Sequence, residues 1–228
     1  MCQFLSALVL KNGDVLSHPM LDSHSDLVRY FKLPDTDVYI QHFAKVELTP
    51  VDWTDAATWT FRVDEDVLPA WWADVAAQAE ATLRDRAARM ILKDGEHDLI
   101  VDGCWIVAGT AQVSDVRSGR IVRVQDSAQI SHVCGSAQIS HVRDSAQISD
   151  VCGSAQISDV WGSAQISHVW GSAQISHVWG SAQISDVRDS AQISDVRDSA
   201  QISDVGDSAT LDASAKAHVV VPVGAVTP

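Results

Sequence analysis

The chain has 228 residues, enough for one or two domains, and its 30 acidic against 16 basic residues give a formal charge of −14. This balance argues against direct binding of nucleic acid, which needs clustered Lys and Arg, and no apolar segment reaches the length of a membrane span. Four cysteines without a regular spacing, and no basic residues ahead of the short apolar run at 4–10, favour a reducing cytoplasm over export.

The first hundred residues predict a small domain of mixed helices and strands. Alternating or continuous apolar residues predict strands over 3–10, 38–48, 58–63 and 98–108. Asn12 and Gly13 are typical of a tight hairpin turn after the first strand. A short helix follows near 25–31, and apolar residues recurring every three and four positions predict the main helix over about 69–92, beginning at Pro69 and covering one face of the sheet.

Cys2 and His24 are the candidate catalytic residues of this first domain. Removal of the initiator Met would leave Cys2 with a free amine, the arrangement of N-terminal nucleophile hydrolases. His24 would act as the base and Asp22 or Asp26 as the group that orients it. The alternatives are a cysteine that packs at a strand start and a helix cap around His24.

A run of three acidic residues, 64–66, precedes the main helix. It could hold a cation, but acidic residues before a helix also interact favourably with the helix dipole. We assign no metal and no cofactor, because no cluster in the chain has metal-ligand spacing in sequence. Cys104 is expected to be a core thiol.

A nine-residue phrase, Ser-Ala-Gln-Ile-Ser-(Asp or His)-Val and two variable residues, occupies 127–207 in nine uninterrupted copies. Ser-Ala-Gln-Ile-Ser alternates polar and apolar residues at the period of a strand, and the Gly or Asp that ends each copy suits a tight corner. Two degenerate phrases, 110–117 and 118–126, precede the copies. Strands and corners at constant spacing predict a β-solenoid.

The number of phrases in one coil follows from the position that holds Asp or His. Residues 18 apart at this position are opposite in type in six of seven pairs, against three of eight for residues nine apart. Two phrases therefore form each coil, and His stacks on Asp along both sheets. The predicted ladder residues are His132, Asp150, His168 and Asp186 in one column, and His141, Asp159, His177 and Asp195 in the other.

The same 18-residue spacing predicts contacts at the corners. Trp161 should stack on Trp179, with Arg143 and Arg197 at either end, and Trp170 should lie beneath Arg188. These six are the candidate binding residues, since Trp and Arg dominate binding hot spots; corner stacking is the alternative role. Cys134 should lie over Cys152, within bridging distance if the thiols are oxidised. The ladder aspartates are expected to raise the pKa of the ladder histidines.

Two other classes of solenoid protein were considered. Hexapeptide acyltransferases also have coils of 18 residues, but their three sides need a six-residue period, which this chain lacks. A DNA mimic would suit an acidic rod, yet nine acidic and three basic residues over 127–207 give about one charge per 3.6 Å, half the density of duplex DNA. The mimic remains a minority hypothesis.

Several segments together resemble a group of proteins encoded by bacteriophages. They are MCQFLSALVLKNGDVL, LDSHSDLVRYFKLPD, AKVELTP, FRVDEDVLPAWW, DGCWIVAG and the SAQISDV phrases. The group joins a small α/β head to a β-solenoid of variable repeat number, and it has no assigned activity. The resemblance implies a phage origin and expression in the host cytoplasm, and it transfers no catalytic residue.

The fold class predicted is mainly β: an α+β head over 1–109, a two-sided parallel β-solenoid over 110–216 and a C-terminal cap over 217–228. The leading functional hypothesis is a non-enzymatic phage protein whose solenoid binds a host or phage protein, without direct contact to nucleic acid or membrane. The competing hypothesis is a hydrolase or amidotransferase-like head that uses Cys2, with the solenoid as a spacer or oligomerisation arm. Self-association into a homo-oligomer is compatible with either.

Overall fold

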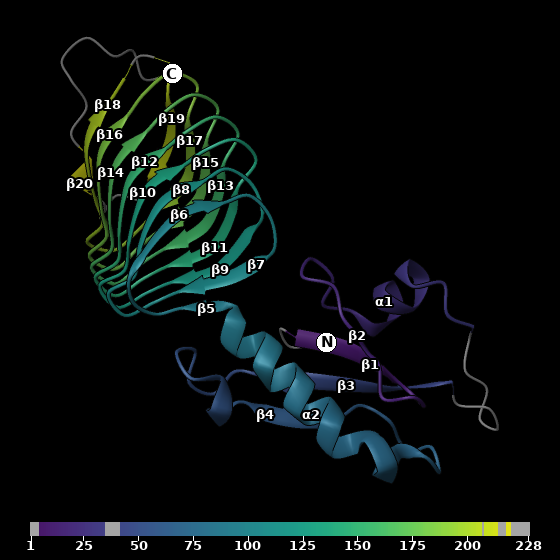
Figure 1. The fold of residues 1–228 in the computed structure, drawn as a ribbon. Helices are drawn as coiled ribbons and strands as arrows, with labels where there is room; N and C mark the ends of the chain where they lie inside the picture. Colours follow the sequence, from purple (N-terminus) through teal and green to yellow (C-terminus); the bar gives the residue numbers. More distant parts are fainter. Residues whose placement is uncertain (1–4, 35–41, 207, 214–217, 220–228) are drawn as a thin grey trace. The chain divides into compact units, whose positions relative to one another are not determined.

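The computed structural model describes residues 5–34, 42–206, 208–213 and 218–219, and it divides into two compact units, Met1–Ile91 and Leu92–Pro228 (Figure 1). Cys2 and all but two residues of the predicted C-terminal cap lie outside the described residues. The first unit has an antiparallel sheet with helices, and the second is a parallel β-solenoid. The predicted fold class is confirmed.

The head sheet has four antiparallel strands in the order β2-β1-β3-β4. They are β1 (Leu5–Leu10), β2 (Val15–Leu16), β3 (Phe43–Thr49) and β4 (Thr60–Val63). The predicted hairpin turn joins β1 to β2: Gly13 has a φ of 87°, and the Leu10 amide donates to the Asp14 carbonyl at 2.8 Å. The central strand β3 pairs with β1 on one side and with β4 on the other, so its side chains have fixed positions.

Among its described residues, 5–34 and 42–91, the head also has two α-helices and one short 3-10 helix: α1 (His24–Tyr30), η1 (Ala56–Thr58) and α2 (Trp72–Arg89). The main helix begins three residues after Pro69, and its buried residues recur at three and four: Trp72, Val75, Ala79, Leu83 and Ala87. α2 contacts β2 and β3 of the sheet (Figure 1). Arg84 of α2 holds η1 in place by donating to the carbonyls of Ala56, Ala57 and Trp59.

The solenoid consists of two eight-stranded parallel sheets, and successive strands alternate between them (Figure 1). One sheet, here called the even sheet, holds β6 (Glu96–Ile100), β8 (Gln112–Val116), β10 (Gln129–Val133), β12 (Gln147–Val151), β14 (Gln165–Val169), β16 (Gln183–Val187), β18 (Gln201–Val205) and β20 (His218–Val219). The odd sheet holds β5 (Ile91–Leu92), β7 (Cys104–Val107), β9 (Arg120–Val124), β11 (Gln138–Val142), β13 (Gln156–Val160), β15 (Gln174–Val178), β17 (Gln192–Val196) and β19 (Thr210–Ala213).

The two-phrase coil is confirmed by the register of these sheets. Gln129 pairs with Gln147 and Ile130 with Ile148, and the same 18-residue offset continues from coil to coil. Ala, Ile and Val of each phrase are almost fully buried between the sheets, whereas Gln is exposed on every strand of the repeat. The interior therefore has the same apolar composition in each coil, and neighbouring coils stack with like on like.

The corners depend on residues with positive φ. Gly occupies this place in five phrases, and Asp126, Asp144, Asp189 and Asp198 adopt it with φ near 60°. The Asp189 carboxylate accepts from the Gly171 amide one coil below at 3.1 Å. An aspartate at a corner therefore compensates for its backbone conformation by bonding the preceding coil.

The strand predicted over 98–108 is two strands, β6 and β7, separated by Gly103 with a φ of 83°. β6 pairs with β8, and β7 pairs with β9, so both belong to the solenoid sheets. The first coil thus precedes the first degenerate phrase, and the compact unit that contains it begins at Leu92.

Candidate functional site

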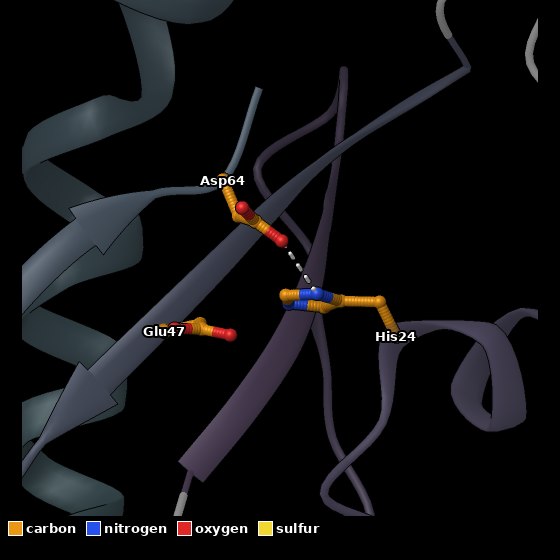
Figure 2. Close-up of side chains that lie close together, drawn as sticks. All are labelled: His24, Glu47 and Asp64. Atoms are coloured by element: carbon orange, nitrogen blue, oxygen red, sulfur yellow. Dashed lines mark ion pairs between the residues drawn. The ribbon is translucent and has the colours of Figure 1, made fainter. Parts of the chain in front are cut away.

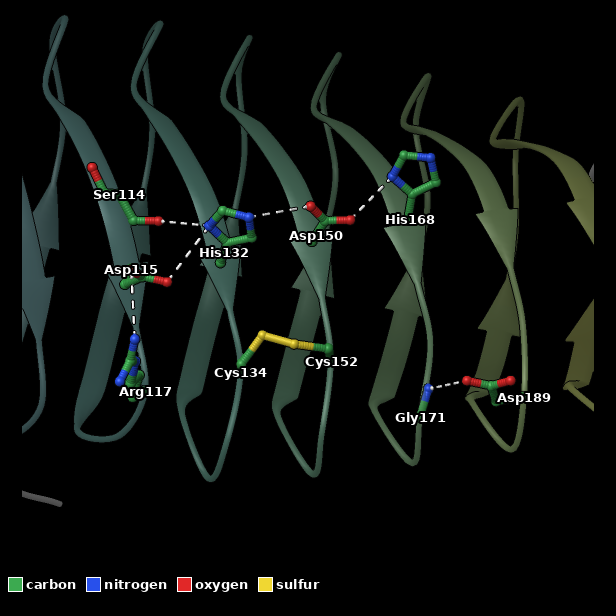
Figure 3. The surroundings of a disulfide bond; sticks show 10 residues. All are labelled: Ser114, Asp115, Arg117, His132, Cys134, Asp150, Cys152, His168, Gly171 and Asp189. Carbon is green, nitrogen blue, oxygen red and sulfur yellow. Dashed lines mark hydrogen bonds and ion pairs between the residues drawn. A yellow bond between two sulfur atoms is a disulfide. The ribbon is translucent and has the colours of Figure 1, made fainter.

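The even sheet carries a column of alternating Asp and His along its outer face (Figure 3). Nδ1 of His132 lies 3.5 Å from an Asp115 carboxylate oxygen, and Nε2 lies 3.6 Å from Asp150. The other oxygen of Asp150 lies 3.1 Å from Nδ1 of His168. His168 is also in register with Asp186, although the ion pair of Asp186 is with Arg188, at 2.6 Å.

The odd sheet carries the second column. Asp159 lies between His141 and His177, and each imidazole Nδ1 is 3.1 Å from one of its carboxylate oxygens. His177 is in register with Asp195, which forms its ion pair with Arg197 at 2.7 Å. The hydrogen bond that Arg197 donates to the Asp195 carboxylate raises the pKa of Arg197, so this guanidinium is charged at any ordinary pH. Arginine thus replaces histidine as the partner of aspartate towards the C-terminal coils.

One ladder histidine contradicts the expectation that stacked aspartates raise its pKa. Burial lowers the pKa of His141, and the nearby guanidinium groups of Arg123 and Arg143 act in the same direction, whereas Asp159 acts against them. Arg123 stands in register with His141 one coil below, so this histidine has an aspartate, Asp159, on one side only. The protonated form of the first odd-sheet histidine is therefore disfavoured.

This lowered pKa predicts how His141 contributes to stability as a function of pH. In the unfolded chain His141 is protonated as pH falls through about 6.5, whereas in the folded chain its protonation needs a lower pH. Between these two pKa values His141 therefore lowers the free energy of unfolding as pH falls. Above this window the effect is absent. The change His141→Gln should therefore raise the thermal midpoint relative to wild type at pH 5.5 more than at pH 7.5.

Thermal unfolding of wild type and variant at the two pH values measures this difference. Gln138→Ala, on the exposed face of the same strand, is the matched control without a titrating group, and it should show the same offset from wild type at both pH values. A His141→Gln offset that stays constant, or that grows towards pH 7.5, would contradict the assignment.

Trp161 and Trp179 form a stacked pair at one edge of the solenoid, after strands of the odd sheet. Their ring centroids are 5.7 Å apart with an interplanar angle of 27°. The guanidinium carbon of Arg143 lies 4.4 Å from the centroid of the Trp161 ring, at the distance of a cation–π contact. Arg197 follows one coil after Trp179. This odd-edge column, Arg143, Trp161, Trp179 and Arg197, has the order expected from the sequence.

Trp170 lies on the opposite edge, because successive corners alternate between the two edges of a two-sided coil. Its column begins with Cys134 and Cys152, which form a disulfide across adjacent coils (Figure 3). Arg188, one coil above Trp170, forms ion pairs with Asp186 and Asp204 and so bridges two like charges that stack on each other. The three tryptophans of the repeat therefore lie on two separate edges, with Trp179 exposed on one and Trp170 on the other.

A shallow pocket of about 220 Å³ lies beside the odd-edge column. Trp179 supplies its aromatic surface, and the other lining residues are Asp159, His177, Val178, Asp195 and Arg197. With 43% of Trp179 exposed, its ring is open to a partner. The pocket combines an aromatic wall with charged groups of both signs, which suits recognition of a protein side chain.

The head brings together three side chains that the sequence did not group. His24 at the start of α1, Glu47 of β3 and Asp64 just after β4 present ligand atoms that all lie within 4.8 Å of one another (Figure 2). His24 is 5% exposed, and its Nδ1 is 3.3 Å from an Asp64 carboxylate oxygen. The predicted orienting residue Asp26 instead pairs with Arg29 at 3.0 Å.

Sequence analysis selected His24 but assigned its partners from neighbouring positions. Glu47 and Asp64 are brought to it by antiparallel pairing of β3 with β4, and the Asp64 amide donates to the Lys45 carbonyl at 2.8 Å. The available signal was the acidic run at 64–66, for which the sequence allowed either a cation site or helix-dipole stabilisation, without pointing to His24 or Glu47. Cys104 is buried, as expected for a core thiol.

No family model, curated protein or solved structure matches this chain. The functional conclusions below therefore rest on the arrangement of its own residues. Within the described part of the chain, no helix has the length and apolar character needed to cross a membrane.

Proposed function

We propose that the protein is a non-enzymatic interaction protein whose solenoid binds a host or phage protein through the odd-edge column. The observation that carries this proposal is the stacked pair of Trp161 and Trp179, in which Trp179 is 43% exposed, with Arg143 against the Trp161 ring and Arg197 one coil after Trp179. Trp and Arg are among the residues most enriched at binding hot spots, and here two tryptophans lie between two arginines over four consecutive coils on one edge.

The rigidity of the column favours tight binding. Each of these side chains is anchored on a corner whose backbone bonds the coil below, as in the bond from the Trp179 amide to the Val160 carbonyl at 3.0 Å. Side chains that are already ordered lose less entropy on association. The pocket beside Trp179 would accept an apolar side chain, and its ion pairs would surround that side chain with a polar rim.

A phage origin is part of the proposal, and it rests on the resemblance described for the head and repeat segments. Expression in the cytoplasm of a bacterial host follows from that origin. A solenoid of variable repeat number would then change the reach of the protein while preserving the chemistry of each coil. The partner would be a host or phage protein, with neither nucleic acid nor membrane as a direct ligand.

The geometry gives less support to the alternative functions. For a DNA mimic, carboxylates should follow one another at the spacing of phosphates, but Asp150 and Asp159 each contact two histidines, which separate them from the next carboxylate of their column. For a hydrolase with Cys2 as nucleophile, His24 would be the base, but its closest carboxylate partner is Asp64 and its ring is buried.

A capture experiment tests the proposal. Immobilised full-length protein should retain a specific protein from bacterial host lysate, and the double change Trp161→Ser with Trp179→Ser should reduce its recovery at least tenfold, since each hot-spot residue contributes about 2 kcal/mol. The retained protein, once purified, should show the same loss of affinity in a direct titration.

Trp170→Ser is the matched control, because Trp170 is as exposed as Trp179, at 45% against 43%, but lies on the opposite edge. It should leave capture unchanged. Equal loss with Trp170→Ser, or equal retention by all three proteins, would refute binding through the odd-edge column. Retention of a second copy of this chain alone would replace the heterologous partner by self-association.

A further inference from the structure

We propose that His24, Glu47 and Asp64 of the head bind a divalent transition-metal ion, and that this ion is Zn²⁺. The three residues come from α1, β3 and the residue after β4, and they lie far apart in the chain. This site is separate from the interaction surface proposed for the solenoid, and neither proposal depends on the other.

The hydrogen bond of His24 to the backbone determines which ring nitrogen faces the carboxylates. Nε2 lies 3.0 Å from the Val46 carbonyl oxygen, which can only accept, so Nε2 must carry a hydrogen. Nδ1 is then the atom that faces the Asp64 carboxylate, with the Glu47 carboxylate close by (Figure 2). Histidine ligands of metals commonly donate their second nitrogen to a backbone carbonyl in this way, which fixes the tautomer and the ring orientation.

The charges of the cluster favour a divalent cation over a simple ion pair. Glu47 and Asp64 bring two carboxylates within 4.8 Å of a ligand nitrogen of one imidazole, and His24 itself is 5% exposed. A divalent cation balances both carboxylates, whereas a single imidazole can carry at most one positive charge.

The ligand types and their spacing select the metal. One imidazole nitrogen and two carboxylate oxygens are ligands of Zn²⁺, whereas Mg²⁺ and Ca²⁺ prefer oxygen alone. Tetrahedral ligands at about 2.0–2.1 Å from zinc lie about 3.3–3.4 Å from one another, and Nδ1 lies 3.3 Å from the Asp64 oxygen. Three protein ligands leave one coordination position for water, on the side where Asp64 is exposed.

The backbone holds the three ligands before any ion arrives. Glu47 lies on the central strand, opposite Ser6 of β1 and Arg62 of β4. Asp64 is held beside β3 by the hydrogen bond that its backbone amide donates to the Lys45 carbonyl. The Glu65 carboxylate forms an ion pair with Lys45 at 3.7 Å, so Glu65 remains outside the cluster. A site whose ligands are fixed in this way needs little rearrangement to bind an ion.

Isothermal titration calorimetry tests the site: ZnCl₂ is added to the full chain after treatment with a chelator, and the number and affinity of bound zinc ions are measured. We expect one equivalent of zinc to bind in the head, Mn²⁺ to bind more weakly, and Mg²⁺ and Ca²⁺ not to compete. The changes Asp64→Asn and Glu47→Gln should each weaken this equivalent at least tenfold. Zinc should also raise the thermal midpoint of the wild type but not that of the Asp64→Asn protein.

Two control variants separate this site from other zinc ligands in the chain. Asp66→Asn removes a nearby exposed carboxylate and should bind zinc as the wild type does. His168→Gln removes a ladder histidine of the solenoid, and the head equivalent should persist. Zinc binding that is absent from the wild type, or that is unchanged by both Asp64→Asn and Glu47→Gln, would overturn the proposal and leave a His24–Asp64 ion pair.

Discussion

Replacing Ile157 by Ala is expected to lower the free energy of unfolding of the central coils by about 2–5 kcal/mol, the usual cost of truncating a buried Ile. Ile157 is 1% exposed, and it stacks between Ile139 and Ile175 of the neighbouring coils. The interior has no second layer that could close the cavity, because the two sheets meet directly. Chemical denaturation of wild type and variant measures the effect.

Gln156→Ala, one residue away on the exposed face, is the control and should change stability by no more than about 0.5 kcal/mol. Because coils contact only their neighbours, hydrogen exchange should show the loss of protection in the strands beside β13 first. Equal effects of the two substitutions would contradict an interior formed by the Ile column. A uniform loss of protection along the rod would contradict nearest-neighbour stabilisation.

Opening the disulfide between Cys134 and Cys152 is expected to lower stability by about 3 kcal/mol, from the entropy of closing a loop of this length. The bridge joins residues 18 apart, so it links two adjacent coils that are already held by backbone hydrogen bonds. Denaturation with and without a reducing agent measures the contribution. In a reducing cytoplasm the thiols would be separate and this contribution would be lost.

The Cys134→Ser and Cys152→Ser proteins should each match the reduced wild type, and a reducing agent should not affect them further. The two variants control for each other, because each removes the bridge from one side only. Unchanged stability on reduction would mean that the backbone pairing of β10 with β12 already accounts for the order of these coils.

The solenoid could be predicted in detail because its contacts follow a fixed sequence spacing. Alternation of His and Asp at intervals of 18 residues revealed the coil, and the register places His132 opposite Asp150 as that interval requires. The prediction of a raised pKa was wrong for His141, because its neighbour one coil below is Arg123 from a degenerate phrase. Where the repeat is imperfect, periodicity no longer identifies the neighbour.

The head could be predicted only at the level of its elements. Its strands, its hairpin turn and α2 follow from local apolar patterns, but the cluster around His24 depends on which strands pair and in what register. Glu47 lies near His24 because β3 is an inner strand of the sheet. Asp64 lies near His24 because it directly follows β4, which pairs with β3. No local sequence pattern encodes this antiparallel strand order. Asp26, which is nearer to His24 in sequence, forms an ion pair with Arg29 instead.

Because successive corners lie on opposite edges of the solenoid, inserting or deleting an odd number of phrases has a different effect from inserting or deleting an even number. Loss of one phrase, for instance 145–153, would transpose every later corner to the other edge and would place Trp170, instead of Trp161, above Arg143. Loss of two consecutive phrases would return each later residue to its own edge. The chain can therefore be lengthened or shortened only by pairs of phrases if its two edges are to keep their separate chemistries.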